Sequence, residues 1–447
     1  MKYDQLSGGF NEMKKINKVL SLGLALSLTA AALSACGSNS GNKEAESTAG
    51  GSAEGKTKLR IYAQYSDEDT KGYYDYAAAE LAKEMPNVEL ELEIQAQDDG
   101  QKLKTYAATG NLPDIFNTGL DLINVFRESN NILQLDEYVD KFGFKDKMLP
   151  SALNTLYTED QHVYAFPYAG NEVILLYYNK ELFEQNGVKV PTTMEEMHAA
   201  IDAFKAKGIT PLSIFAKEKW PDVAFYDIFA TRYNPAGISA LDKGQAKPSD
   251  PGYKQAAQDI VDLVKAGLLP KGATNLNYDQ AAALFHEGKA AMFVNGQWEI
   301  EASTKALGDK VGYMYYPAPD AASYEANKLA FSGGGNPGGY AVSANTKHKE
   351  LAAEVASFMA LKYAEFKVTK KGSPIVSTKV EKAVEKAYDP LMEQLAQDLP
   401  NITSTTAFAW GLSNTKFKAA IEDASQALLS GSYTADQFIA DLENGMK

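Results

Sequence analysis

The sequence predicts an α/β fold built from two α/β lobes and a mostly helical C-terminal part. Three observations lead to this prediction. Apolar strand-like runs alternate with helical patterns over residues 59–116, the alternation returns over residues 173–294, and helical spacing predominates after residue 345. Strands that alternate with helices in this way are typical of sheets covered by helices. At 447 residues the chain is long enough for about two or three domains.

The first α/β unit is predicted from five consecutive segments. Residues 59–63 are an apolar run, and residues 88–94 alternate apolar and polar side chains with a period of two, so both are expected to be strands. Residues 74–81 have the apolar spacing of a helix, and residues 102–109 form a second helix that Gly110 ends. A short strand is expected over residues 113–116.

The middle of the chain repeats this order. Residues 173–178 are an apolar strand, and Thr193 with Glu196 fits the capping box of a helix. Another helix is expected after Pro251, which follows a capping aspartate, and residues 281–287 form a helix that leads into a strand over residues 290–294. Near the end, Thr434 is expected to cap the last helix.

The N-terminal residues have the pattern of an export signal. A basic segment at residues 13–18 precedes an apolar run at residues 19–35, which ends in Leu-Ser-Ala before Cys36. This ending resembles the lipobox of bacterial lipoproteins, so residues 1–36 are interpreted as a signal peptide that is cleaved before a lipidated Cys36. The alternative is a single membrane-anchor helix. Residues 37–56 contain no large apolar side chain and are expected to be a flexible tether.

Composition excludes several function classes. The 58 acidic residues outnumber the 44 basic ones, and a net charge of −14 disfavours nucleic-acid binding. One cysteine and four scattered histidines do not provide a disulfide or a thiolate zinc site. Residues 333–338 formally fit G-x-G-x-x-G, but a proline and a strand-like run follow where a dinucleotide site needs a helix. We therefore expect no catalytic residues, no metal and no cofactor.

The three tryptophans are the strongest candidates for a ligand site. Trp220 precedes a proline, Trp298 follows Asn-Gly-Gln, and Trp410 lies between alanine and glycine. A tryptophan in a core is normally flanked by periodic apolar residues, whereas these three are at chain breaks. Pyranose rings present an apolar face that stacks on such side chains, and polar residues then bind the hydroxyls. Burial in the core remains the alternative for each of them.

Four stretches resemble the extracellular solute-binding proteins of ABC sugar importers, the family that includes maltose-binding protein. The first is ATGNLPDIF at residues 108–116, which is similar to the family's small-G-x-x-P-D-[IV] segment. The others are AFPY with LYYNKELF (165–168 and 176–183), FHEGKAAM with NGQW (285–292 and 295–298), and GGGNPGGYAV with AAE (333–342 and 352–354). They follow the family's order over nearly all of the chain after the signal.

The resemblance implies a two-lobed, periplasmic-binding-protein-like fold of type II, whose lobes are joined by crossing hinge segments. The hinges are expected near residues 167–171, 313–317 and 361–366. Lobe 1 would then comprise residues 57–166 and 317–362, and lobe 2 residues 168–312 and 364–447.

The resemblance also implies a function and a site. The protein would capture a carbohydrate, an oligosaccharide in our interpretation, and deliver it to the transmembrane subunits of an ABC permease without chemical change. It would be a monomer on the outer face of a Gram-positive-type cell membrane, held there by its lipid alone. The ligand-binding residues carried over by position are Tyr65, Asp67, Asn117, Thr118, Asp121, Asn171, Trp220, Trp298, Gly334, Asn336 and Trp410.

Two other functions are compatible with the sequence. A secreted carbohydrate-active enzyme would place two carboxylates about 5–10 Å apart in the cleft. The same fold could instead bind ferric ion through tyrosines, of which the chain has 25, or a polyamine or a phosphate ester.

Overall fold

A computed structural model describes residues 55–447 of the chain. The predicted signal peptide, the lipidation site at Cys36 and nearly all of the predicted tether lie outside the described residues. Within residues 55–447, the model has no helix whose length and apolar character would suffice for a membrane crossing.

The first of two large sheets has the strand order β2-β1-β3-β11-β4. Its strands are β1 (Thr57–Ala63), β2 (Val88–Ile94), β3 (Ile115–Thr118), β4 (Ala165–Phe166) and β11 (Gly339–Val342). β1 pairs in parallel with β2 and β3, and β11 runs antiparallel to β3 and β4. The first three strands confirm the predicted unit at residues 59–116, with β3 displaced two residues toward the C-terminus.

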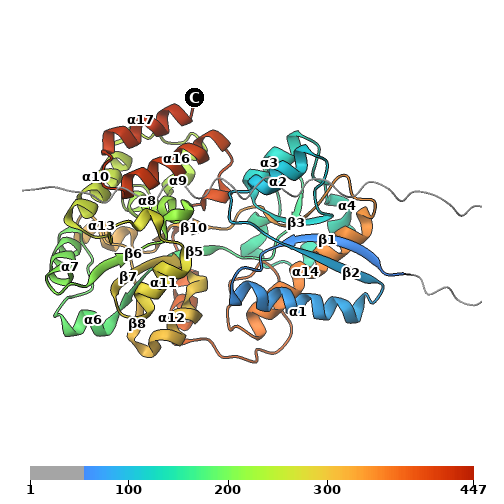
Figure 1. Cartoon of the computed structure of the whole chain (residues 1–447), viewed down its shortest axis with the longest axis horizontal. Coiled ribbons are helices and arrows are strands. Elements are labelled where there is room, and N and C mark those ends of the chain that lie inside the picture. The colour runs from blue at the N-terminus through green and yellow to red at the C-terminus, as the bar shows by residue number, and fades with distance from the viewer. Residues whose placement is uncertain (1–54) are drawn as a thin grey trace, which may run out of the picture. The chain divides into compact units, whose positions relative to one another are not determined.

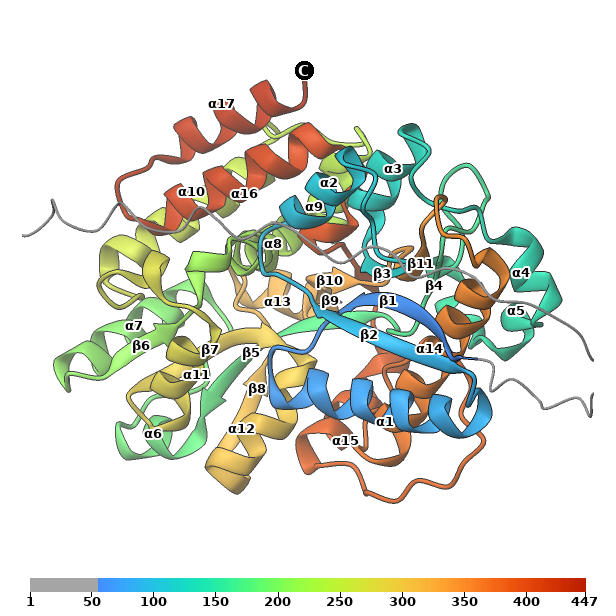
Figure 2. The same cartoon turned by 45° about the vertical axis from the view of Figure 1, so that its right-hand side comes forward.

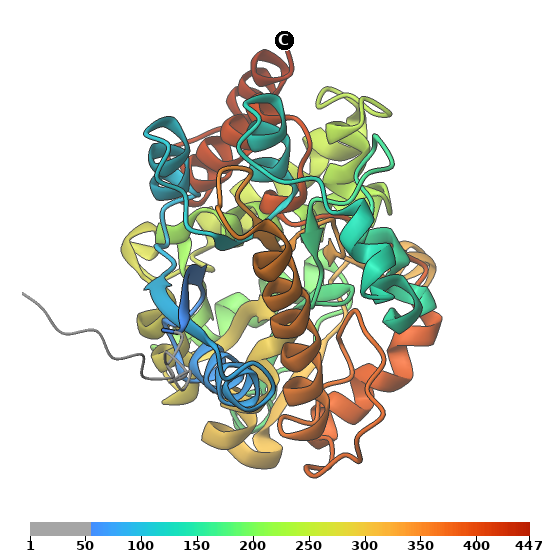
Figure 3. The same ribbon diagram turned by 90° about the vertical axis from the view of Figure 1, so that its right-hand side faces the viewer.

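Helices cover this sheet, and together they are called the first lobe here. They are α1 (Glu68–Glu84), α2 (Gln101–Ala108), α3 (Leu120–Glu128), α4 (Asp136–Lys141), α5 (Phe144–Lys147) and α14 (Lys349–Thr369). Although α1 and α14 are far apart in sequence, they pack side by side, as the blue and brown-orange helices in Figure 3 show. A capping box between Asp67 and Thr70 begins α1.

The second large sheet has the order β10-β5-β7-β6, and β8 also pairs with β5. Its strands are β5 (Glu172–Asn179), β6 (Thr210–Ser213), β7 (Ala290–Gly296), β8 (Val311–Met314) and β10 (Gly333–Gly334). β5 and β7 confirm the predicted strands, whereas β6 and β8 are short and were not predicted. A small separate sheet joins β9 (Ala330–Phe331) to β12 (Ser404–Thr405).

The helices around this sheet form the second lobe (Figure 1). They are α6 (Lys180–Gln185), α7 (Met194–Ala206), α8 (Trp220–Tyr233), α9 (Gly237–Asp242), α10 (Pro251–Ala266), α11 (Tyr278–His286), α12 (Ile300–Leu307), α13 (Ala321–Asn327), α15 (Pro390–Asp398), α16 (Thr415–Leu429) and α17 (Ala435–Gly445). The C-terminal helices α16 and α17, red in Figure 2, pack on each other and on α10. Thr193 and Thr434 form the predicted capping interactions at α7 and α17.

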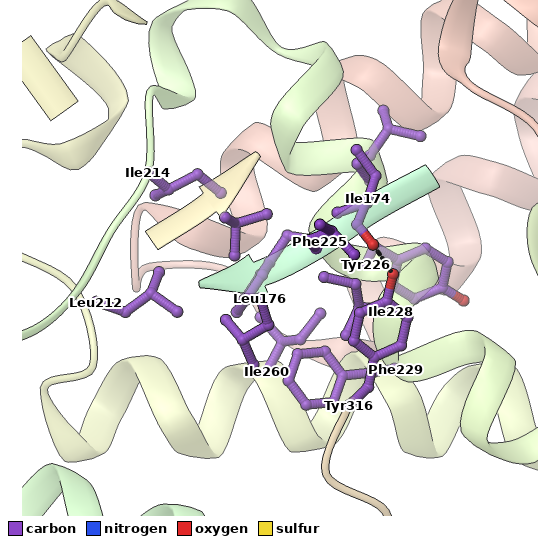
Figure 4. Close-up of a cluster of buried hydrophobic side chains, with 14 of the residues drawn as sticks. Ile174, Leu176, Leu212, Ile214, Phe225, Tyr226, Ile228, Phe229, Ile260 and Tyr316 are labelled. Carbon is purple, nitrogen blue, oxygen red and sulfur yellow. Dashed lines mark hydrogen bonds between the residues drawn. The ribbon is translucent and has the colours of Figure 1, made fainter. Parts of the chain in front are cut away.

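The core of the second lobe lies between its sheet and α8. Ile174 and Leu176 of β5 face Ile228 and Phe229 of α8, and the hydroxyl of Tyr316 donates to the carbonyl of Ile174 at 2.5 Å (Figure 4). Each large apolar side chain that is fully buried in this way contributes about 1.5–3 kcal/mol. Helix α8 is buried almost all round, so its N-terminus at Trp220 is held firmly in place.

The passages between the two sheets differ in part from the prediction. β4 ends at residue 166 in the first sheet and β5 begins at residue 172 in the second, with residues 167–171 between them. The expected passage near 313–317 is wrong, because α13 packs on α8 and β10 pairs with β5, so the chain stays with the second lobe until Gly334. The glycine-rich loop before β11 makes this passage.

The expected passage near residues 361–366 is also wrong. These residues lie inside α14, which continues to Thr369 because residues 349–371 contain neither glycine nor proline. The chain still contacts the first lobe through bridges from Val376 to Ala169 and from Thr378 to Met148. It also contacts the second lobe here, since Ile375 is buried with the core of that lobe and Lys371 pairs with Glu301 of α12. It then enters the second lobe at α15, which packs on α12 and β8.

Candidate ligand-binding site

The structure brings the three tryptophans together with Phe408 on the second lobe, and this group is called the tryptophan cluster here. The ring centroid of Trp220 lies 5.9 Å from that of Trp298 and 5.4 Å from that of Trp410. Phe408 stacks on Trp410 at 4.4 Å with an angle of 5° between the rings. All three tryptophans are half-buried, so each keeps part of its ring surface accessible. The sequence predicted the three tryptophans but not Phe408.

Local chain geometry holds each ring in place. Lys219 adopts a left-handed conformation with φ of 59°, and the following Trp220 starts α8 with Pro221 in its first turn. Trp410 lies in a short 3₁₀ turn, and Trp298 lies in another one immediately after β7. The proline and the turns are the signals that set these tryptophans apart from a core pattern in the sequence.

Several candidate residues from the first lobe and the connecting loops border the cluster. A Cβ on Gly119 would lie 2.9 Å from the carbonyl oxygen of Trp410, so the start of α3 touches the cluster. A Cβ on Gly411 would lie 2.0 Å from Nδ2 of Asn336, and this Nδ2 is buried without a hydrogen-bond partner among residues 55–447. A ligand oxygen could pair with this donor if the contact with Gly411 opened.

The loop that contains Asn336 joins two more candidate residues to this region. Gly334 has φ of 152° and pairs with Glu172 at the start of β5. Asn171 packs against Gly335 and donates from Nδ2 to the carbonyl of Ser151 at 3.1 Å. The carbonyl of Thr118 faces Gly338. Thr118, Asn171, Gly334, Asn336 and the tryptophans therefore lie around one region between the sheets.

Three other candidates have polar groups that bond within the protein. Tyr168 donates to Asn117 Oδ1 at 2.7 Å, and Asn117 Nδ2 donates to Gln95 at 2.9 Å. Asp67 caps α1 by accepting from the backbone of Thr70 at 2.8 Å. Tyr65 donates to Asp75 at 3.3 Å. A ligand role for these side chains stays a prediction.

Asp121 belongs to a buried ion-pair group that joins the lobes. Lys418 of α16 lies 3.6 Å from Asp121 of α3 and 2.9 Å from Glu422, one turn further along α16. Burial raises the pKa of both carboxyls, and Lys418 counteracts part of that rise. The three side chains border a cavity of about 220 Å³ between α2, α3 and α16.

Glu172 is a polar residue of this region that the sequence analysis missed. It is half-buried and accepts from Gln297 Nε2 at 3.2 Å, beside Trp298. Burial raises the pKa of Glu172 to about 7, and the nearby ammonium of Lys367 limits the rise. Lys367 itself is buried and pairs with Asp69 of α1 at 3.0 Å. A charged residue at the start of an otherwise apolar strand is the signal that could have identified Glu172.

The pKa of Glu172 predicts how stability depends on pH. The folded protein keeps this proton up to about pH 7, whereas an unfolded glutamate releases it near 4.5, so the folded state binds more protons between these values. The free energy of unfolding should therefore fall as pH rises through this range, and Glu172→Gln should reduce that slope. Urea denaturation of both proteins from pH 4.5 to 7.5 measures it. Equal slopes in both would contradict the assignment.

Comparison with known proteins agrees with this architecture. The model of the bacterial extracellular solute-binding proteins matches residues 66–364. The chain is 25% identical to the multiple sugar-binding protein of Streptococcus mutans over 78% of this chain and 79% of that protein. It is also 24% identical to an uncharacterised ABC transporter extracellular-binding protein of Pyrococcus horikoshii, over 59% of this chain and 60% of that protein.

Solved structures show the same fold. A protein from work on xylan utilization by Caldanaerobius polysaccharolyticus superposes with a TM-score of 0.76 at 27% identity, covering 88% of this chain and all of that one. A chitin oligosaccharide binding protein superposes with a TM-score of 0.74 at 23% identity, covering 87% of this chain and 98% of that one. These neighbours confirm the predicted type II fold. The chain belongs to the bacterial extracellular solute-binding protein family.

Proposed function

We propose that the protein captures a carbohydrate, preferably an oligosaccharide, between its two lobes and delivers it to an ABC permease. The observation that carries this proposal is the tryptophan cluster, whose half-exposed rings lie where the backbone of Trp410 meets the first lobe at Gly119. Aromatic faces of this kind stack on the apolar faces of pyranose rings. The relative from Streptococcus mutans is named as a sugar-binding protein, which supports the same ligand class.

In this proposal, the rings supply apolar contact and the surrounding polar groups select hydroxyls. Asn336, Asn171, Thr118 and Glu172 border the cluster, and Asn336 has a free buried donor. The other candidates from the sequence, Tyr65, Asp67, Asn117 and Asp121, would complete the site when their present bonds rearrange. Because contacts to both lobes form only when the lobes close, a bound sugar would shift the population toward the closed form.

The same proposal covers location and organisation. The family is extracellular, which places the folded part outside the cytoplasm. We propose that Cys36 carries a lipid that anchors a monomer to the outer face of the membrane, with the tether in between. The lobes would be divided at the passages that the sheets indicate, at residues 167–171, 335–338 and 379–389.

A thermal-shift screen tests the ligand class. Free ligand at about 100 times its Kd stabilises a protein by about 2.7 kcal/mol, which raises the melting temperature measurably. We expect one or more oligosaccharides to do so, with calorimetry giving the stoichiometry. Ferric ion, polyamines and sugar phosphates form the comparison set. The proposal fails if one of these stabilises the protein and none of the sugars does.

A further inference from the structure

Glu299 is a buried carboxylate that directly follows Trp298 in the 3₁₀ turn at Gln297–Glu299. Its side chain is 0% exposed, and both of its carboxylate oxygens accept hydrogen bonds. Oε1 accepts from His286 Nε2 at 2.8 Å and from Ser303 Oγ at 2.9 Å, while Oε2 accepts from Asn295 Nδ2 at 3.1 Å and from the hydroxyl of Tyr278. The group formed by Glu299 and these four donors is called the Glu299 cluster here.

The Glu299 cluster ties the turn to three separate elements. Tyr278 and His286 lie at the two ends of α11, Asn295 lies in β7, and Ser303 lies in α12. A buried carboxylate that accepts this many hydrogen bonds is rigidly oriented, because each lost bond would leave an unpaired buried polar group. The backbone at residue 299 is therefore fixed from the side of α11 and α12.

The residue before Trp298 is fixed from the opposite side. Gln297 is buried, its Oε1 accepts from the backbone amide of Val173 at 2.8 Å, and its Nε2 donates to Glu172. Both neighbours of Trp298 are thus anchored by their side chains, one to β5 and the other to α11 and α12. The backbone of Trp298 is therefore held in place on both sides.

The position of the indole depends on this turn. A Cβ at Gly296 would lie 2.3 Å from the six-membered ring of Trp298, so the ring folds back over the glycine backbone. The hydroxyl of Tyr177 holds the same backbone by donating to the carbonyl of Gly296 at 2.8 Å. A small change in the backbone at residues 296–299 would therefore change the position of the ring relative to Trp220 and Phe408.

We propose that Glu299 is a positioning residue that holds the Trp298 indole in its ligand-binding geometry before the ligand arrives. This inference rests on the proposed function for its effect on affinity. Glu299 itself is completely buried with all its partners within the protein, so it acts through Trp298 and does not touch the ligand. A ring held in place in advance loses little conformational freedom on binding.

The first test uses fluorescence without any ligand. In the Trp220→Phe/Trp410→Phe background, Trp298 is the sole tryptophan of the chain. Adding Glu299→Ala should raise the acrylamide quenching constant of Trp298 and shift its emission to the red. The conservative Glu299→Gln should stay closer to the background protein, because the hydroxyl of Ser303 or of Tyr278, whichever faces the new amide nitrogen, can turn to accept from it.

The second test measures affinity in the natural background, using a sugar that the thermal-shift screen has identified. The cost of ordering one side chain on binding corresponds to about 2- to 10-fold in Kd, and we expect this weakening for Glu299→Ala with partial recovery in Glu299→Gln. Glu287→Ala is the matched control, because that carboxylate is exposed and pairs with Lys289. It should change neither quenching nor affinity.

Stability is measured for every variant so that a merely structural role can be recognised. If Glu299→Ala lowers the melting temperature but leaves both quenching and affinity unchanged in the folded protein, the proposal is overturned. If that variant does not fold, His286→Ala, which removes one donor from a partly exposed position, takes its place with the same expectations. If no sugar binds the natural protein, the proposed function fails, while the quenching result still decides whether Glu299 positions Trp298.

Discussion

Alanine in place of Trp410 should weaken carbohydrate binding by about 2 kcal/mol or more, which is about 30-fold in Kd. Trp410 stacks on Phe408, packs edge-on against Trp220 and meets the first lobe at Gly119. Its loss removes a stacking surface, whereas the contact with Gly119 is made by the backbone carbonyl and Cβ and is kept in alanine. Titration calorimetry with the sugar found by thermal shift measures the effect.

Two variants serve as controls for this prediction. Trp410→Phe keeps an aromatic face and should retain much of the affinity. Tyr433→Ala removes a half-buried aromatic side chain from the turn between α16 and α17 and should leave the Kd unchanged. Unchanged affinity in Trp410→Ala would exclude the tryptophan cluster from ligand binding.

Methionine in place of Lys418 should lower the free energy of unfolding by about 3–5 kcal/mol. Lys418 is the cation between Asp121 and Glu422, which are 7% and 6% exposed. Without it, the two buried carboxylates lose their nearest countercharge. Asp121 belongs to α3 and Glu422 to α16. The repulsion between these two carboxylates is therefore partly relieved when the lobes move apart. Urea denaturation measures the stability, and small-angle X-ray scattering measures the opening.

The exposed Lys416 on the same helix provides the control, and Lys416→Met should leave stability almost unchanged. The triple variant Asp121→Asn/Lys418→Met/Glu422→Gln should regain much of the loss, because it buries no net charge. A stable, compact Lys418→Met protein would show that water reaches these carboxylates and that the pair does not hold the lobes together.

Local rules predicted the parts of the fold that depend on neighbouring residues. The alternation at residues 88–94 and the capping residues Thr193 and Thr434 appear in the structure as expected, because the responsible contacts lie within a few residues. The passage expected near residues 313–317 was misplaced because it depends on β10, a strand of two residues whose only sequence feature is Gly-Gly. Its pairing with β5 is decided by tertiary packing.

The same distinction holds for the site. The tryptophans could be identified because proline, glycine and turns accompany them in the sequence. The ion pair of Asp121 could not be predicted, because its partner Lys418 lies far away in the sequence. Glu172 had only one sequence signal, its place at the start of an apolar strand, and nothing near Glu299 in the sequence shows that its carboxylate is buried. Only the packing of β5, β7, α11 and α12 determines that.

The central strand arrangement of the first sheet has a consequence for synthesis. In that sheet β3 lies between β1 and β11, and β4 pairs only with β11. At about 5–20 residues per second, a ribosome takes about 10–40 seconds to extend the chain from β3 to β11. During this interval the apolar edge of β3 has no final partner, and such pairings across long sequence separations form slowly. The first sheet can therefore be completed only after the chain up to β11 has emerged, and until then its open edge is exposed to aggregation.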